Sequence, residues 1–161
     1  MTVDQQACVD LVALLAARKQ TVAVAESLTG GLLAAAFVQV PGASQVFRGG
    51  VCTYATQTKH SVLGVSAEQL ALTGPVAPEV AQQMAVGVRR LMGANFGLAT
   101  TGVAGPGPSD GHPAGTVFIA CTWADDARVV PLALSGDREQ VRAGTVANIL
   151  ALFGQVLRRL T

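Results

Sequence analysis

The chain has 161 residues, of which half are apolar and 13% are charged, and its formal net charge is +1. This composition allows a sizeable core and excludes a disordered chain, so we expect residues 1–161 to form a single domain. No long run of Lys or Arg is present, which argues against a nucleic-acid partner or an acidic membrane surface. An apolar chain with so few charges leads us to expect a homo-oligomer, either a dimer or a trimer.

The cysteines and histidines point to neither a disulfide nor a metal site. Cys8, Cys52 and Cys121 are odd in number and widely spaced, which is typical of reduced thiols. Neither His60 nor His112 belongs to a pattern with metal-ligand spacing, so we expect no metal. The N-terminus lacks a signal-peptide pattern, and the apolar runs are too short to span a bilayer. We therefore expect a cytoplasmic protein.

The predicted elements alternate between helices and strands. In chain order they are a helix over 4–18, a strand over 21–25, a helix over 28–40, a strand within 49–55, a short helix over 66–73, a helix over 78–92, a strand over 96–101, strands over 116–123 and 128–134, and a helix from about 137 onward. The last two strands form a hairpin, which adds antiparallel pairing to the alternating pattern. The sequence therefore predicts an α/β fold, a three-layer α/β/α sandwich with a mixed, mostly parallel sheet.

A serine lies in a glycine-rich turn between the first predicted strand and the helix that follows it. Ser27 is a candidate nucleophile, and the first N–H groups of the helix favour negative charge above this turn because they lack intrahelical partners. Thr29, Gly30 and Gly31 complete the turn, and the glycines allow a ligand to approach the backbone closely. The alternative is a turn that only packs a helix against a strand.

Two further polar segments follow predicted strands. Tyr54 and Lys59 follow the strand within 49–55. The other segment opens a long loop over 102–115, and its sequence is Thr101-Gly102-Val103-Ala104-Gly105-Pro106. Ligands of open α/β sheets bind at the carboxyl ends of the strands, so we expect both segments to lie near Ser27. Loops of this length in a compact domain usually carry function.

A catalytic serine needs a base, and neither histidine belongs to a recognisable triad. The chain has only two lysines, and Lys19 lies at the end of the predicted first helix, which leaves Lys59 as the candidate base. Lys59 can act in this way if burial or a neighbouring cation lowers its pKa toward neutrality, and Tyr54 could relay the proton. The alternative is a solvated surface lysine.

Eight motifs occur in this chain in the order found in the CinA C-terminal family. They are Ala25-Glu26-Ser27-x-Thr29-Gly30-Gly31, Val40-Pro41-Gly42-Ala43-Ser44, Gly49-Gly50-Val51, Tyr54-x4-Lys59, Leu63-Gly64-Val65, Thr101-Gly102-x-Ala104-Gly105-Pro106, Gly115-Thr116-Val117 and Gly136-Asp137-Arg138. From about residue 5 to the C-terminus, the chain resembles a stand-alone member of this family. We expect no additional N-terminal domain, since the predicted first helix starts almost at Met1.

The resemblance implies nicotinamide-nucleotide amidohydrolase activity, in which nicotinamide mononucleotide and water yield nicotinic acid mononucleotide and ammonia. The cationic pyridinium makes the carboxamide carbon electrophilic, so Ser27 would attack it while Lys59 accepts and returns the proton. Backbone N–H groups over 29–31 or 101–105 are candidate oxyanion donors. No cofactor is expected for this route.

The phosphate of such a substrate needs a cation. Arg138 lies in the matched Gly-Asp-Arg motif, and Arg142 lies four residues further on the same helix face, although both could also form an ordinary exposed pair. The predicted substrate-binding residues are Thr29, Gly30, Gly31, Thr101, Gly102, Ala104, Gly105, Pro106, Arg138 and Arg142.

The chain departs from the family pattern at several polar positions. Leu28, Thr56 and Ala77 stand where family members usually have Cys, Asn and Ser, and the 107–113 loop lacks the usual acidic and lysine pair. Two other functions therefore stay open. One is a catalytically silent nucleotide-binding or interaction domain of the competence-damage-inducible type, and the other is hydrolysis of a different small amide.

Overall fold

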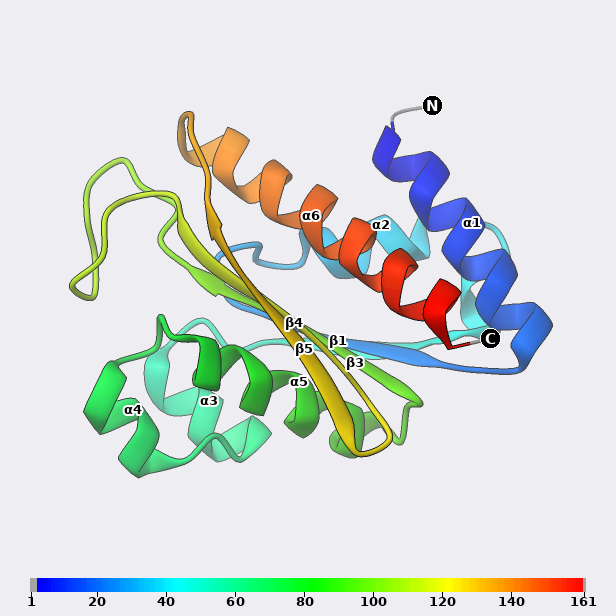
Figure 1. Cartoon of the computed structure of the whole chain (residues 1–161), viewed down its shortest axis with the longest axis horizontal. Coiled ribbons are helices and arrows are strands. Elements are labelled where there is room, and N and C mark those ends of the chain that lie inside the picture. Colours follow the sequence, from blue (N-terminus) through cyan, green and yellow to red (C-terminus); the bar gives the residue numbers. More distant parts are fainter. Residues whose placement is uncertain (1–2, 161) are drawn as a thin grey trace.

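The structure, a computed structural model, describes residues 3–160 and contains one sheet between two layers of helices (Figure 1). The helices are α1 (Val3–Arg18), α2 (Leu32–Val38), α3 (Thr56–Leu63), α4 (Ala67–Thr73), α5 (Pro78–Met92) and α6 (Arg138–Arg159), with a 3-10 helix η1 (Ala43–Gln45). The strands are β1 (Val22–Glu26), β2 (Phe47–Cys52), β3 (Phe96–Gly102), β4 (Thr116–Trp123) and β5 (Asp126–Ala133). The predicted three-layer α/β/α sandwich is confirmed.

The sheet has the strand order β2-β1-β3-β4-β5. β1 pairs in parallel with β2 and β3, whereas β4 is antiparallel to both β3 and β5. β4 alone therefore runs against the other strands, and the predicted mixed, mostly parallel sheet is confirmed. The carboxyl ends of β1, β2 and β3 share one edge of the sheet, where the segments that follow them can meet.

The side chains buried between the sheet and its two helical layers differ in size from one face to the other. α1, α2 and α6 cover one face, where the large side chains Phe37, Phe96 and Phe153 are buried (Figure 1). α3, α4 and α5 cover the other face, which is lined mainly by small residues of β1, β3 and β4. Gly97 illustrates how close α5 lies, because a Cβ at this position would overlap the backbone oxygen of Ala85.

Most helix boundaries follow from local capping chemistry. α4 is capped by Ser66, whose side chain accepts a hydrogen bond from Gln69 N, and α5 starts at Pro78. Gly93 ends α5 in the left-handed conformation, with φ 60°. Asp137 forms a capping box at the start of α6. The predicted helices over 66–73, over 78–92 and from about 137 onward are thus confirmed.

Two elements near the site differ from the prediction. α2 begins at Leu32 rather than at residue 28, because Gly30 and Gly31 adopt positive φ angles of 56° and 105° and keep residues 28–31 in a turn. α3 was not predicted, and it carries Lys59. The nucleophile candidate therefore precedes a turn, and the base candidate lies on a helix.

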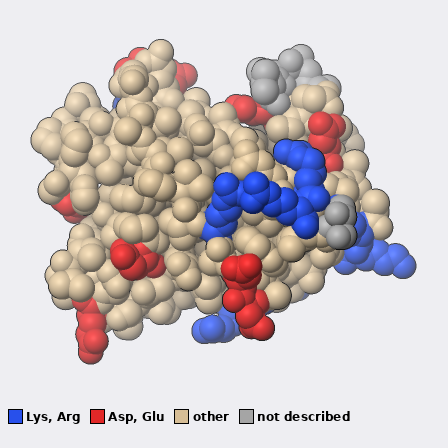
Figure 2. Space-filling view, in the orientation of Figure 1, with Lys and Arg blue, Asp and Glu red and all other residues tan. Residues whose placement is uncertain are grey.

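The surface carries few charges. On the face shown in Figure 2, acidic and basic side chains form small separate groups within a mostly uncharged surface, in keeping with a charged fraction of 13%. Within residues 3–160, none of the helices combines the length and the apolar character that a membrane span needs.

Candidate active site

Ser27 and Lys59 lie side by side at the carboxyl edge of the sheet. Ser27 follows β1 directly, Lys59 lies on α3, and Lys59 Nζ is 3.0 Å from Ser27 Oγ. Ser27 is 8% exposed and Lys59 is 1% exposed, so the pair is shielded from bulk water. The structure thus brings the predicted nucleophile within hydrogen-bonding distance of the predicted base.

The environment of Lys59 raises the share of its neutral form above that of an ordinary lysine. Burial lowers the pKa of Lys59 from 10.5 to about 8, against smaller effects of Cys52 and Asp110 that raise it. Its Nζ also donates a hydrogen bond of 2.5 Å to Thr53 O. A neutral amine in this position can keep one N–H on that carbonyl and direct its lone pair at Ser27 Oγ. Lys59 is therefore not the solvated surface lysine of the alternative interpretation.

Glu26 occupies the N-terminus of the helix that follows the Ser27 turn. Its carboxylate is 2% exposed and accepts hydrogen bonds from Leu33 N at 2.8 Å and Ala34 N at 3.0 Å. The first N–H groups of α2, which the sequence suggested would favour the negative charge of a ligand, are thus used by a side chain of the chain itself. Glu26 fixes α2 against the end of β1.

A buried pair of threonines anchors the same turn to the neighbouring strand. Thr29 and Thr100 are both 0% exposed, and their hydroxyl oxygens are 2.8 Å apart. Ser27 N donates to Thr100 Oγ1 at 3.4 Å. These contacts hold the backbone of Ser27 on β3, so Thr29 acts within the fold rather than at the cavity surface.

Arg142 reaches the Ser27 turn from α6. Its Nε donates to Leu28 O at 2.8 Å, and its second guanidinium nitrogen donates to Thr29 O at 3.1 Å. Leu28 O thereby gains a partner, and Thr29 O gains a second donor besides Leu32 N, which bonds it at 3.0 Å. Arg142 thus supports the turn, and its predicted contact with substrate stays a prediction.

Tyr54 and Arg138 form the exposed part of the site. Arg138 donates to Gly105 O at 2.6 Å and to the Tyr54 hydroxyl at 3.2 Å. Tyr54 is 61% exposed, and this hydrogen bond directs its hydroxyl to Arg138 rather than to the buried lysine. The proton relay through Tyr54 stays a prediction, whereas Arg138 lies where the polar end of a ligand can reach it.

These side chains surround a cavity of about 190 Å³. The predicted site residues that line it are Ser27, Tyr54, Lys59, Thr101, Gly102, Ala104 and Arg138. The predicted residues outside its lining are Thr29, Gly30, Gly31, Gly105, Pro106 and Arg142. The Thr101–Pro106 segment is thus a wall of the cavity, and the 29–31 segment lies behind the nucleophile. Of the two predicted oxyanion segments, only the one around Gly102 lies at the cavity.

Several lining residues were missed by sequence reasoning. They are Leu28, Thr56, Pro75, Val76, Val103, Ser109 and Asp110. Leu28 and Val103 stand between predicted site residues, so their position in the motifs was a usable signal. Pro75 gave no such signal, because it reaches the site through the hydrogen bond of 2.7 Å that its carbonyl accepts from Thr101 Oγ1.

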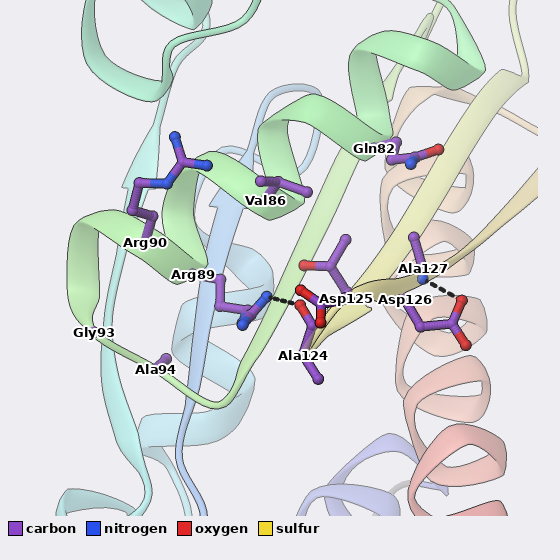
Figure 3. A pocket seen from close by; sticks show the side chains of 11 residues that line it. Gln82, Val86, Arg89, Arg90, Gly93, Ala94, Ala124, Asp125, Asp126 and Ala127 are labelled. Carbon is purple, nitrogen blue, oxygen red and sulfur yellow. Dashed lines mark hydrogen bonds between the residues drawn. The ribbon is translucent and has the colours of Figure 1, made fainter.

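A larger groove of about 750 Å³ lies at the opposite edge of the sheet, between α5 and the turn that joins β4 to β5 (Figure 3). Arg89 extends across it and donates a hydrogen bond of 2.6 Å to Ala124 O, while Asp126 accepts one from Ala127 N (Figure 3). The Arg89 bond connects α5 to the turn between β4 and β5, and the Asp126 bond lies within the start of β5. Among the residues that the structure describes here, no nucleophile lies beside a base as it does at Ser27.

Comparison with known proteins gives a consistent result. The family model described as the CinA C-terminal domain matches residues 4–157. A CinA-like protein of Frankia casuarinae is 48% identical over 144 residues, which are 89% of this chain and 33% of that protein. The chain thus spans about a third of the length of the curated relatives it matches.

Solved structures resemble the chain over nearly its whole length. A competence-damaged protein (CinA) superfamily protein from Klebsiella pneumoniae is 34% identical, with a TM-score of 0.94 over 98% of this chain and 99% of that one. The competence/damage inducible protein CihA from Agrobacterium tumefaciens is 31% identical, with a TM-score of 0.92 over 98% of this chain and 99% of that one. On its sequence, its fold and the extent of the match, this chain belongs to the CinA C-terminal domain family.

Proposed function

We propose that this chain is an amidohydrolase that converts nicotinamide mononucleotide and water to nicotinic acid mononucleotide and ammonia. The observation that carries the proposal is the buried Ser27–Lys59 pair, with 3.0 Å between Oγ and Nζ. A buried lysine whose partners are a hydroxyl and a carbonyl lowers the stability of a fold. A domain that only binds or packs has no need of this arrangement, whereas a hydrolase does.

The chemistry follows from the two groups. Neutral Lys59 takes the proton of Ser27 as Oγ attacks the carboxamide carbon, and it returns that proton to the nitrogen as the C–N bond breaks and ammonia leaves. Water then attacks the ester on Ser27, again giving a proton to Lys59, and the carboxylic acid product is released as Oγ regains its proton. The cavity wall around Gly102 would receive the oxyanion in both steps.

The size of the cavity suits the reacting end of the substrate. Its volume of about 190 Å³ is smaller than that of pockets enclosing whole drug-sized ligands, about 300 Å³ or more. We infer that the amide-bearing ring enters the cavity while the ribose and phosphate stay at its mouth. Arg138 lies there, with N–H donors beyond the two used by Gly105 O and Tyr54, and would bind the phosphate.

The test is incubation of the pure protein with nicotinamide mononucleotide, with ammonia and nicotinic acid mononucleotide measured in parallel. Both products should appear in equal amounts. Ser27→Ala and Lys59→Arg should each reduce the rate by at least about a thousandfold, since a guanidinium stays protonated and cannot serve as the base. Ser61→Ala is the matched control, because Ser61 is an exposed serine on the same helix as Lys59.

The outcomes separate the three functions considered. Equal release of both products that depends on Ser27 supports the proposal. Binding of the nucleotide without turnover would favour the silent binding domain, and turnover of other small amides alone would favour a different substrate. Full activity of Ser27→Ala would reject the nucleophile and with it the mechanism.

A further inference from the structure

The loop after Pro106 holds Asp110, which lines the cavity, in an ordered turn. Ser109 and His112 pair through two backbone hydrogen bonds, of 3.0 Å from Ser109 N and 2.9 Å from His112 N. The two residues between them, Asp110 and Gly111, have φ angles of 52° and 79°. Two consecutive positive φ angles in a two-residue hairpin are typical of a type I′ turn. The long loop therefore ends in a small, ordered hairpin rather than an irregular tip.

Asp110 belongs to the lining of the cavity that holds Ser27 and Lys59. Asp110 lines the same cavity as Ser27, Lys59 and Arg138, and it accepts a hydrogen bond of 3.1 Å from Ser109 Oγ. Arg138 is bonded to Gly105 O and Tyr54 instead of to this carboxylate. Asp110 and Arg138 thus line the same cavity, and in the part of the chain that the structure describes no hydrogen bond joins the two side chains.

We propose that Asp110 recognises a positive charge on the ring that carries the scissile amide, so that the site prefers cationic amides over neutral ones of the same shape. The proposal rests on the proposed amidohydrolase function and deepens it by naming the residue that selects for the positive charge of the ring. Arg138 would hold the anionic end of the same molecule, and Asp110 would face its cationic end. The preferred substrate is therefore a zwitterion.

Such a ring would also affect the base. In the empty cavity, the charge of Asp110 raises the pKa of Lys59 and so works against the neutral amine. A cationic ring beside Asp110 offsets that effect and brings a like charge toward Lys59. Binding of the right substrate would therefore favour loss of the Lys59 proton, at the stage when the amine is needed.

The variant that tests this is Asp110→Asn. It removes the charge and keeps the shape, and Asn before Gly is a preferred pair for a type I′ turn, so the hairpin is retained. Asp125→Asn is the matched control, because Asp125 is an exposed aspartate in the turn at the opposite edge of the sheet (Figure 3). Both variants change the net charge of the chain equally.

Binding is measured by calorimetry in the Ser27→Ala background, which prevents turnover. The two probes are nicotinamide mononucleotide, with a cationic ring, and benzamide riboside 5′-monophosphate, an analogue with a neutral ring. Asp110→Asn should weaken binding of the cationic nucleotide about threefold at low ionic strength and leave the neutral analogue unchanged. Asp125→Asn should change neither.

A second measurement uses the protein with Ser27 intact. Asp110→Asn should move the rising limb of kcat/KM to lower pH, because the carboxylate that raises the pKa of Lys59 is gone. A role of Asp110 in the shape of the loop alone would leave this limb in place.

The results distinguish the two proposals. Equal weakening of both probes, or of neither, would overturn the charge preference of Asp110 while leaving hydrolysis intact. Discrimination between the probes without ammonia release from the intact protein would overturn the amidohydrolase alone. Failure of both probes to bind at millimolar concentration would overturn both.

Discussion

The pH dependence of kcat/KM follows directly from the burial of Lys59. With a pKa of about 8, about one Lys59 side chain in eleven is neutral at pH 7, whereas at the unshifted value of 10.5 the fraction would be about one in 3,000. Since only the neutral amine can accept the Ser27 proton, kcat/KM should rise about tenfold for each pH unit below 7 and level off above about pH 9. The groups that oppose this shift are the Cys52 thiol and the Asp110 carboxylate.

The assay follows initial rates of nicotinic acid mononucleotide formation from pH 6 to 9.5 at constant ionic strength and at substrate concentrations well below KM. At these low substrate concentrations, the pH profile reports the pKa values of the free enzyme. A profile that stays flat between pH 6 and 8, or one that still rises tenfold per pH unit up to pH 9.5, would show that Lys59 is not a base with a lowered pKa. Lys59→Arg should show no rising limb of this kind.

Three substitutions test other parts of the structure. Lys59→Met should abolish hydrolysis and raise the free energy of unfolding by about 2 kcal/mol at pH 7, as measured by urea titration. This gain should shrink as the pH rises from about 8 to 10.5, because in that range Lys59 is neutral in the folded protein and still protonated in the unfolded chain, so the natural chain becomes more stable. Arg142→Met should lower kcat more than it raises KM, because it removes two hydrogen bonds to the Ser27 turn and leaves only Thr29 O bonded, through Leu32 N. The free energy of unfolding should fall by about 2 kcal/mol, and a rise in KM alone would show that Arg142 binds substrate. Gly97→Ala should lower the unfolding free energy by about 3 kcal/mol, since its Cβ would overlap Ala85 O, and a melting temperature unchanged from that of the natural chain would contradict the close packing of α5 on β3.

The layered fold was predictable because its signals are local. Pro78 and Gly93 mark the ends of α5, and Asp137 marks the start of α6 in the sequence itself. Apolar alternation between helices and strands then defines the layers. Ser27 was found in the same way, since a serine in a glycine-rich turn after a buried strand is visible in the sequence.

The surroundings of the site were less predictable, for two physical reasons. α3 lacks an apolar stripe, since the residues it buries are Lys59 and Leu63, so the periodicity that reveals most helices is missing. The glycines at 30 and 31 look like a ligand cradle, yet the neighbouring helix end is occupied by Glu26, whose partner N–H groups lie seven and eight residues further along. Side-chain contacts of this kind depend on the tertiary fold and leave no pattern in composition or spacing.

Arg142 on α6 contacts the Ser27 turn, so residues near the two ends of the chain meet beside the site. The turn that presents Ser27 is held by a guanidinium 114 residues further along the chain, on the last helix described. During synthesis, the nucleophile therefore emerges long before the group that steadies it. Under the proposed function, hydrolysis would require the completely assembled sandwich. A nascent chain ending before α6 would then be inactive, even with Ser27 and Lys59 already made.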